Sequence, residues 1–453
     1  MPRFPSIHNP LSAAALLCIA CTIAHAQPTN EDFKILADDR EAGDMFGVAV
    51  AADRGVIVVG AVADDDNGDR SGAAYLFDSA TGVQLAKLIP DDGEAGDEFG
   101  CAVAIRDGFV VVGARGDDDR GLNSGSAYLF DATTGTQLAK LLADDGGASD
   151  GFGVSVSIDD GLVAVGADLR YFAFGAAYVF DASTGDQVSQ LLPEPFGAAW
   201  SYFGRSVAIE NGLVAVGEPY RGQFGKHTGT AYVFDAASGD QVVQLLPESW
   251  NLFAQFGWSI AIDGGVVAVG AHQQNTDGVF SAGAGFLFDA TSGSQLHMLA
   301  ADDGVANDYL GTSIAISDGI VAIGAVGTDD NGAHSGAAYV FDAASGTQTA
   351  KLVPSDGAAE DHFGHSIAIA GGLVVAGSPQ SDIENGANTG SAYLFDLAGC
   401  AADFNSDGDV NTLDVLTFLN AWAAGDAAAD FNRDGSVNTL DVLAFLNAWT
   451  AGC

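Results

Sequence analysis

The residues best suited to chemistry lie in the C-terminal part of the chain, where an acidic segment starting at Asp403 is repeated from Asp430. Each copy places side-chain oxygens at loop positions 1, 3, 5, 9 and 12, a backbone carbonyl at position 7 and Gly at position 6. Oxygen donors in this order are the ligands that Ca²⁺ prefers. The predicted ligands are Asp403, Asn405, Asp407, Asp409, Asn411 and Asp414, then Asp430, Asn432, Asp434, Ser436, Asn438 and Asp441. A solvated acidic turn is the alternative, but two identical spacings favour two calcium sites.

Short helices are expected to hold these loops. After each loop, apolar residues recur with helical spacing, from Val415 to Trp422 and again from Val442 to Trp449. Two such helices bury little apolar surface, so bound calcium is expected to supply much of the folding free energy of residues 399–453. Position 12 is Asp rather than Glu, and no helix-length segment precedes either loop. In these respects, and across its whole length, the region resembles a type I dockerin domain.

This resemblance implies a partner and a cross-link. Dockerins bind cohesin domains, and in that family loop positions 10 and 11 help to select the partner. The residues at these positions are Thr412 and Leu413 in the first loop and Thr439 and Leu440 in the second. Identical pairs in both copies would allow two binding orientations. The two ends of a dockerin lie close together, so the resemblance also implies a disulfide between Cys400 and Cys453.

The longer part of the chain is built from a module that occurs seven times. Each module opens with a Phe-Gly or Leu-Gly pair, followed by an alternating run, an apolar run ending in Gly, a variable loop, a third strand ending in Asp, a turn and a fourth strand. The pairs begin at Phe46, Phe99, Phe152, Phe203, Phe256, Leu310 and Phe363. Four short strands in each repeat predict an all-β, seven-bladed β-propeller over residues 27–398. The Asp that ends each third strand, such as Asp78, is expected to bond the following turn rather than join a metal ring.

The two ends of this array complement each other. Residues 33–39, FKILADD, match the fourth strand of a module, whereas the seventh module stops after its third strand. We therefore expect the N-terminal strand to pair with the segment 391–395 and to close the ring, which removes two exposed strand edges. An open solenoid is the alternative.

The Phe-Gly pairs, the Gly-Ala pairs after the second strands and the AYLFD third strands resemble the FG-GAP repeats of integrin α-subunit propellers and their bacterial relatives. The resemblance covers residues 33 to 396 and implies a propeller, although one fold hosts many functions. Integrin repeats often carry a calcium loop just before the second strand. Here that connection is a short turn, such as Ile262 to Gly265.

The long variable loops and the linkers between blades are expected to emerge on one face. Most are acidic, as in Asp64 to Asp69, which indicates a solvated rim, with weak calcium binding as the alternative. The loops of blades 3 to 5 carry aromatic rings and a few cations, which could stack on sugar rings or anchor a protein. Packing of these rings between the linkers is an equally weighted alternative. The candidate ligand-binding residues are Tyr171, Trp200, Tyr202, Tyr220, Arg221 and Trp250.

The composition is typical of a secreted chain. Residues 1–26 contain Arg3, an apolar core from Leu11 to Ile23 and an Ala-His-Ala segment, which together predict a signal peptide. No later segment is long and apolar enough to predict a membrane span. A net charge of −44 disfavours nucleic acid as a partner. Cys101 is expected to be a free thiol with a packing role.

No motif for catalysis is present. The chain has no nucleophile elbow, P-loop or zinc motif, and His362 and His365 lack a carboxylate at a zinc-site spacing that recurs elsewhere. Near-identical blades favour a non-catalytic binding or adhesion protein, whose propeller recognises an extracellular protein or polysaccharide and whose C-terminal module anchors it to a cohesin-type partner. A carbohydrate-active enzyme of a dockerin-organised assembly, a polysaccharide lyase or hydrolase, is the alternative.

Overall fold

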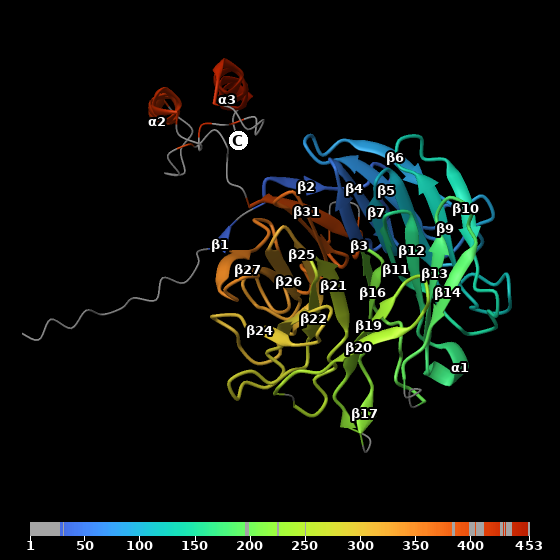
Figure 1. Ribbon diagram of the computed structural model, residues 1–453. Coiled ribbons are helices and arrows are strands. Elements are labelled where there is room, and N and C mark those ends of the chain that lie inside the picture. The colour runs from blue at the N-terminus through green and yellow to red at the C-terminus, as the bar shows by residue number, and fades with distance from the viewer. Residues whose placement is uncertain are drawn as a thin grey trace, which may run out of the picture.

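The computed structural model describes residues 28–29, 31–194, 199–223, 226–249, 251–382, 386–397, 404, 412–425, 429, 431 and 437–451. Between residues 28 and 397, seven β-sheets stand around a common axis (Figure 1). Each blade has four antiparallel strands, and blade 6 gains a fifth, β1 (Pro28–Thr29), which pairs parallel to its outer strand. The predicted seven-bladed propeller is therefore confirmed.

The strands follow one another along the chain in the first four blades. Blade 1 contains β3 (Phe46–Asp53), β4 (Val56–Ala61), β5 (Ala73–Asp78) and β6 (Gln84–Leu88). Blade 2 contains β7 (Phe99–Arg106), β8 (Phe109–Ala114), β9 (Ser126–Asp131) and β10 (Gln137–Leu141). Blade 3 contains β11 (Phe152–Asp159), β12 (Leu162–Ala167), α1 (Arg170–Ala173), β13 (Ala176–Asp181) and β14 (Gln187–Leu191). Blade 4 contains β15 (Val207–Glu210), β16 (Leu213–Glu218), β19 (Thr230–Asp235) and β20 (Gln241–Leu245), with the small hairpin β17 (Gly222–Gln223) and β18 (Lys226–His227) in its variable loop.

The remaining elements include the ring closure and the C-terminal module. Blade 5 contains β21 (Ser259–Asp263), β22 (Val266–Ala271), β23 (Ala284–Asp289) and β24 (Gln295–Leu299). Blade 6 contains β25 (Leu310–Ser317), β26 (Ile320–Ala325), β27 (Ala337–Asp342) and β28 (Gln348–Leu352). Blade 7 contains β29 (Ser366–Ala370), β30 (Leu373–Ser378), β31 (Ser391–Asp396) and β2 (Phe33–Ile35). The helices are α2 (Thr412–Ala424) and α3 (Thr439–Ala451), which confirms the predicted helical C-terminal module.

The core consists of apolar layers between neighbouring blades. The second and third strands are buried almost throughout, whereas the fourth strands are mostly half-buried, as in β6, where Leu85 is exposed and Leu88 is buried. The ring of Phe46 packs edge-on against Tyr75 and Phe77 of the third strand, with ring centroids 5.6 and 5.8 Å apart. Gly47 has φ +91°, and a Cβ there would lie 2.3 Å from the carbonyl oxygen of Ser391 in the neighbouring blade. Close approach of the blades therefore explains why Gly follows each Phe.

In blades 1 to 6, the Asp that ends the third strand is a turn residue, as predicted. Asp78 Oδ1 accepts hydrogen bonds from the backbone N and the hydroxyl of Thr81, at 2.9 and 2.7 Å. Equivalent bonds form in the hairpins of blades 2 to 6. These carboxylates therefore stabilise separate hairpins.

The N-terminal strand closes the ring, as predicted. β2 pairs antiparallel with β31, and Phe33, Lys34 and Ile35 lie opposite Leu394, Tyr393 and Ala392. Elsewhere around the ring, a Gln that opens a fourth strand accepts a bond from a backbone N of the preceding blade. These residues are Gln84, Gln137, Gln187, Gln241, Gln295 and Gln348. At the closure Glu31 takes this role, because its carboxylate accepts bonds from the backbone N and hydroxyl of Ser355, at 2.8 and 2.6 Å.

Candidate functional site

The first strands of neighbouring blades contact one another around the whole ring, which places them nearest to the axis. They begin on the face of the variable loops, because the linker before each of them lies on that face. The residues beside the Phe-Gly pairs, together with those just after the second strands, therefore form an inner rim on this face. Backbone bonds join these two segments, as between Tyr220 N and Ser201 O at 3.2 Å.

Aromatic side chains form a continuous run along the inner rim from blade 4 to the start of blade 6. The ring centroids of Tyr202 and Tyr220 lie 5.0 Å apart, and those of Tyr220 and Trp258 lie 6.5 Å apart. The run continues from Trp258 to His272 at 4.4 Å and from His272 to Tyr309 at 6.2 Å. Burial, reinforced by the charge of nearby Arg205, lowers the pKa of His272 to about 4. The His272 ring is therefore neutral near pH 7 and acts as part of the aromatic surface.

Charged side chains border this run. The Arg205 guanidinium carbon lies 4.8 Å from the centroid of the Trp258 ring, a cation–π arrangement, and its Nη1 lies 3.6 Å from Asp168 Oδ2. Tyr202 and Arg205 also line a cavity of about 340 Å³ together with Glu98, Arg115 and Asp168. The inner rim therefore concentrates arginine, aromatic and carboxylate groups in a chain that has only 16 Lys and Arg residues.

The two carboxylates of this cavity have pKa values shifted in opposite directions. Burial raises the pKa of Asp168, although the charges of Arg205 and Arg115 oppose the shift. Burial would also raise the pKa of Glu98, but its ion pairs with Arg115 and Arg70 hold that pKa below its usual value. Such a pair could act as a general acid and a general base, or it could only hold Arg205, Arg115 and Arg70 in place.

Two of the six candidate ligand-binding residues, Tyr202 and Tyr220, are in ring contact with each other and belong to the inner rim. Tyr171 is half exposed and lies against Arg170, whose Nη2 donates to its hydroxyl at 2.7 Å. Arg221 Nη1 lies 3.1 Å from Oε2 of Glu218, a fully buried carboxylate, so it has a structural role. Trp200 is exposed by 61%. Trp250 lies outside the described residues.

Sequence reasoning missed Arg205, Trp258, His272 and Tyr309 as site residues. A signal was present, because the position after each Phe-Gly or Leu-Gly pair holds Val, Cys or Thr in four blades but Arg205, Trp258 and His365 in blades 4, 5 and 7. A large residue that departs from a repeat at an axial position indicates a site better than an aromatic residue in a long loop.

The acidic rim contains its own counter-charges. Lys87 Nζ lies among the carboxylates of Asp39, Asp64 and Asp66, at 2.8, 2.9 and 2.6 Å. Lys140 and Lys351 hold equivalent carboxylates in blades 2 and 6. An ammonium group thus occupies the place that a cation would take in the loop from Asp64, and this arrangement argues against the calcium alternative there.

The opposite face also has a cavity, of about 620 Å³, near the turns between first and second strands. Its carboxylates link neighbouring blades through the backbone. Asp53 and Asp263, which both line it, accept bonds from backbone N atoms of the next blade, each at 3.0 Å. These acids therefore have a structural explanation, which leaves the inner rim as the better candidate site.

The C-terminal module has a small symmetric core. The rings of Phe418 in α2 and Phe445 in α3 stack at 4.1 Å, and Phe404 and Phe431 pack edge-on against them. Asn438 Oδ1 accepts a bond from the Leu440 N at the start of α3, at 2.8 Å. The two helices therefore repeat one arrangement, as the duplicated sequence predicts.

The described residues of this module fit bound calcium. Asp414 and Asp441, at loop position 12, are fully buried in the first turns of α2 and α3. Residues 399–453 contain eight Asp but only one cationic residue, Arg433, so buried carboxylates here suit a divalent cation. Of the predicted ligands, Asp414, Asn438 and Asp441 are described. The others, Asp403, Asn405, Asp407, Asp409, Asn411, Asp430, Asn432, Asp434 and Ser436, lie outside the described residues.

The predicted partner-selecting residues lie on the surface. Thr412, Leu413, Thr439 and Leu440 are all exposed. The two leucines each begin an exposed stripe, one along α2 and one along α3. These stripes consist of Leu413, Leu416 and Leu419, and of Leu440, Leu443 and Leu446. Apolar stripes of this kind are typical of a protein-binding surface.

Among the described residues Cys101 is a free cysteine, as predicted. Burial raises the pKa of its thiol to about 11, which makes it unreactive near neutral pH. Cys400 and Cys453 lie outside the described residues. Within the part of the chain that the structure describes, no helix has the length and apolar character of a membrane span.

Comparison with known protein families matches seven segments to the FG-GAP repeat, at residues 29–77, 83–130, 136–180, 186–234, 240–288, 294–341 and 347–395. The first segment includes β2, so the count of seven repeats agrees with the ring closure. Residues 401–448 match the dockerin type I domain. A solved structure of the computationally designed Ika8 protein is 16% identical, covers 81% of this chain and 99% of that chain, and has a TM-score of 0.48. The search of curated proteins gives no match.

Proposed function

Since the chain belongs to the FG-GAP repeat family and carries a dockerin type I domain, we propose that it is a secreted binding protein of a cohesin-organised assembly. The propeller recognises an extracellular glycan or protein at the inner rim. The dockerin domain attaches the propeller to a cohesin-type partner through the exposed leucine stripes of α2 and α3. The predicted signal peptide, residues 1–26, supports the extracellular location.

The aromatic run of the inner rim carries this proposal. Its rings come from several blades and contact one another, and Arg205 adds a cation beside them. Aromatic and arginine side chains contribute most of the binding free energy at many recognition surfaces. The aromatic faces can stack on sugar rings or on apolar side chains, and the arginine can bond a carboxylate or hydroxyl group.

The aromatic run can be interrupted by substitutions that copy residues at the same positions of other blades. Val occupies the position of Trp258 in blades 1 and 3, as Val48 and Val154, and Ala63 occupies the position of Tyr220 in blade 1. A Trp258→Val, Tyr220→Ala variant should therefore keep the melting temperature of the propeller. A screen of glycans and extracellular proteins first identifies the ligand of the full mature chain. The variant should then bind this ligand at least about tenfold more weakly, because hot-spot truncations cost 2 kcal/mol or more.

Phe172→Ala is the matched control. This aromatic side chain is 83% exposed in the variable loop of blade 3, and no described ring contact joins it to the run. The control should retain full affinity. If Phe172→Ala and the Trp258→Val, Tyr220→Ala variant lose affinity equally, the binding surface lies on the outer loops and not on the inner rim. Retained affinity in the Trp258→Val, Tyr220→Ala variant would reject the aromatic run as the binding surface.

A carbohydrate-active enzyme is the second candidate, and the carboxylate pair of the inner rim favours it. Asp168, whose pKa is raised, would serve as a general acid, and Glu98, whose pKa is lowered, would serve as a base. Incubation of the full chain with polysaccharides should then release sugar ends, and Asp168→Asn should abolish this release. If a polysaccharide binds at the inner rim and no sugar ends are released, the enzyme candidate is rejected and the binding function remains.

A further inference from the structure

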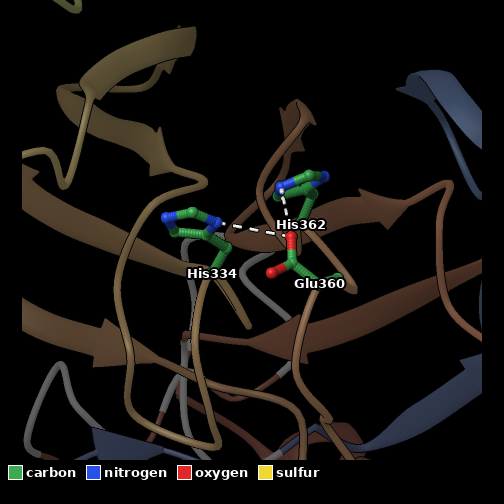
Figure 2. A group of neighbouring side chains, drawn as sticks. All are labelled: His334, Glu360 and His362. Atoms are coloured by element: carbon green, nitrogen blue, oxygen red, sulfur yellow. Dashed lines mark hydrogen bonds and ion pairs between the residues drawn. The ribbon is translucent and has the colours of Figure 1, made fainter.

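Three side chains with metal-binding atoms gather at the boundary between blades 6 and 7 (Figure 2). His334 lies in the variable loop between β26 and β27, and Glu360 and His362 lie in the linker between β28 and β29. Oε2 of Glu360 lies 3.3 Å from Nδ1 of His334 and 3.8 Å from Nε2 of His362. The three ligand atoms all lie within 4.8 Å of one another.

The backbone fixes this convergence. His334, Glu360 and His362 all have positive φ, at 52°, 68° and 54°. Glu360 N donates to Ala333 O at 2.8 Å, and His362 N donates to His334 O at 3.2 Å. These bonds hold the loop of one blade against the linker to the next, so the three side chains start from positions that the fold determines.

The boundary between blades 1 and 2 has the same backbone with different side chains. Gly96 N and Glu98 N donate to Asp69 O and Arg70 O, at 3.0 and 3.1 Å, and Arg70, Gly96 and Glu98 also have positive φ. There, Arg70 and Glu98 form an ion pair. The repeat therefore provides a place where side chains of neighbouring blades meet, and only the boundary of blades 6 and 7 fills it with two histidines and a glutamate.

The donor set suits a borderline transition metal. Imidazole nitrogens and a carboxylate oxygen are ordinary Zn²⁺ ligands, whereas Ca²⁺ and Mg²⁺ prefer oxygen alone. Zn²⁺ bonds of about 2.0–2.2 Å in a tetrahedron place neighbouring ligand atoms roughly 3.3–3.5 Å apart. The two measured distances to Glu360 lie close to this range. A hydrogen bond would explain why one histidine contacts Glu360. It would not explain why two imidazole rings, with planes 27° apart, both lie near the same carboxylate oxygen.

We propose that His334 Nδ1, His362 Nε2 and the Glu360 carboxylate bind one Zn²⁺ ion. The side chains are 48%, 25% and 63% exposed, so water or a ligand group would complete the coordination. Bound zinc would join the loop of blade 6 to the linker of blade 7, on the face that carries the inner rim. Its open position could take a carboxylate or imidazole group of a macromolecule bound there. This site has no recognisable residue spacing in the sequence, because the hairpin of β27 and β28 separates His334 from Glu360 and His362.

Zinc titration of the full mature chain tests the proposal. Saturating Ca²⁺ is present throughout, so that the oxygen-rich loops of the dockerin domain are filled before zinc is added. Calorimetry should show one Zn²⁺ site in the wild-type chain that is missing in a His334→Ala, His362→Ala variant. Glu360→Gln should weaken this site by roughly tenfold or more. Co²⁺ used as a spectroscopic probe should give a d–d absorption band in the wild-type chain that the double variant lacks.

Two control variants separate metal binding from folding. His334→Arg, Glu360→Gly, His362→Glu copies Arg70, Gly96 and Glu98, so it should keep the wild-type melting temperature without zinc and should bind no zinc at this boundary. His297→Ala removes a histidine from β24, whose Nε2 bonds Ala344 O at 3.0 Å, and should leave the zinc titration unchanged. A wild-type titration that matches that of the His334→Ala, His362→Ala variant would overturn the proposal. This outcome is distinct from failure of the inner rim, whose residues none of these variants changes.

Discussion

Deletion of residues 27–38 is expected to lower the melting temperature of the propeller by roughly 10 °C or more. The deletion removes β2, whose residues pair with β31, and it removes the buried side chains of Ile35 and Ala37. It also removes Glu31, which holds Ser355, and Lys34, which pairs with Asp356. Loss of a buried Ile alone typically costs about 2–5 kcal/mol. The exposed edge of β31 should in addition promote association between chains.

Thermal unfolding of the chain that starts at residue 27 and of the deletion variant measures this effect. Glu31→Ala is the matched control, since it removes one side chain of the closure but leaves the strand pairing, and it should lower the melting temperature by far less. Addition of a peptide with the sequence of residues 27–38 should restore part of the loss. An unchanged melting curve after the deletion would contradict the contribution of the closure to stability.

The fold could be predicted because its determinants are local and repeated. The Phe-Gly pairs, the Asp turns and the Gly-ended second strands each follow from the geometry of a few neighbouring residues. The closure was also accessible, since FKI at residues 33–35 matches the fourth strands of other blades. Lys34 occupies the position of Lys87, so even the counter-charge of the acidic rim could have been predicted from the repeat.

The inner rim could not be predicted in the same way. Its residues come from separate modules, and each is a single departure from the repeat rather than part of it. Tyr202 and Trp258, for example, lie on opposite sides of a Phe-Gly pair in different blades. Which departures meet depends on the curvature of the ring and on the direction of each side chain. The long loops are rich in aromatic residues, but Tyr171 is bound to Arg170 of the same loop, and Arg221 is bound to Glu218 at the end of β16.

The meeting of the two histidines could not be predicted from the repeat either. His362 was visible in the sequence, but its partner His334 belongs to the preceding blade, and Glu360 lies only two residues away. Alternation along a strand or helical spacing would not bring these residues together. Positive φ values and cross-loop backbone bonds do so, and such features become visible only in the folded chain.

Removal of calcium is expected to unfold the dockerin domain while the propeller stays folded. The domain has a small core around Phe418 and Phe445, and its buried Asp414 and Asp441 carry charges that a divalent cation would balance. Chelation should therefore abolish the helical signal of α2 and α3 and make residues 401–448 sensitive to proteases. The melting transition of the propeller should remain, since Lys87 and its equivalents balance the acidic rim without metal.

Two point variants and a control make this expectation specific. Asp414→Ala and Asp441→Ala should each remove one of two Ca²⁺ ions, as calorimetry on the full chain would count them. The double variant should bind no calcium in this domain and should lose a cohesin-type partner, because the leucine stripes would no longer be held on two ordered helices. Asp426→Ala makes the same change of charge outside both loops and should leave the stoichiometry at two. A domain that keeps its helices and its protease resistance in chelator would show that the carboxylates are balanced without calcium.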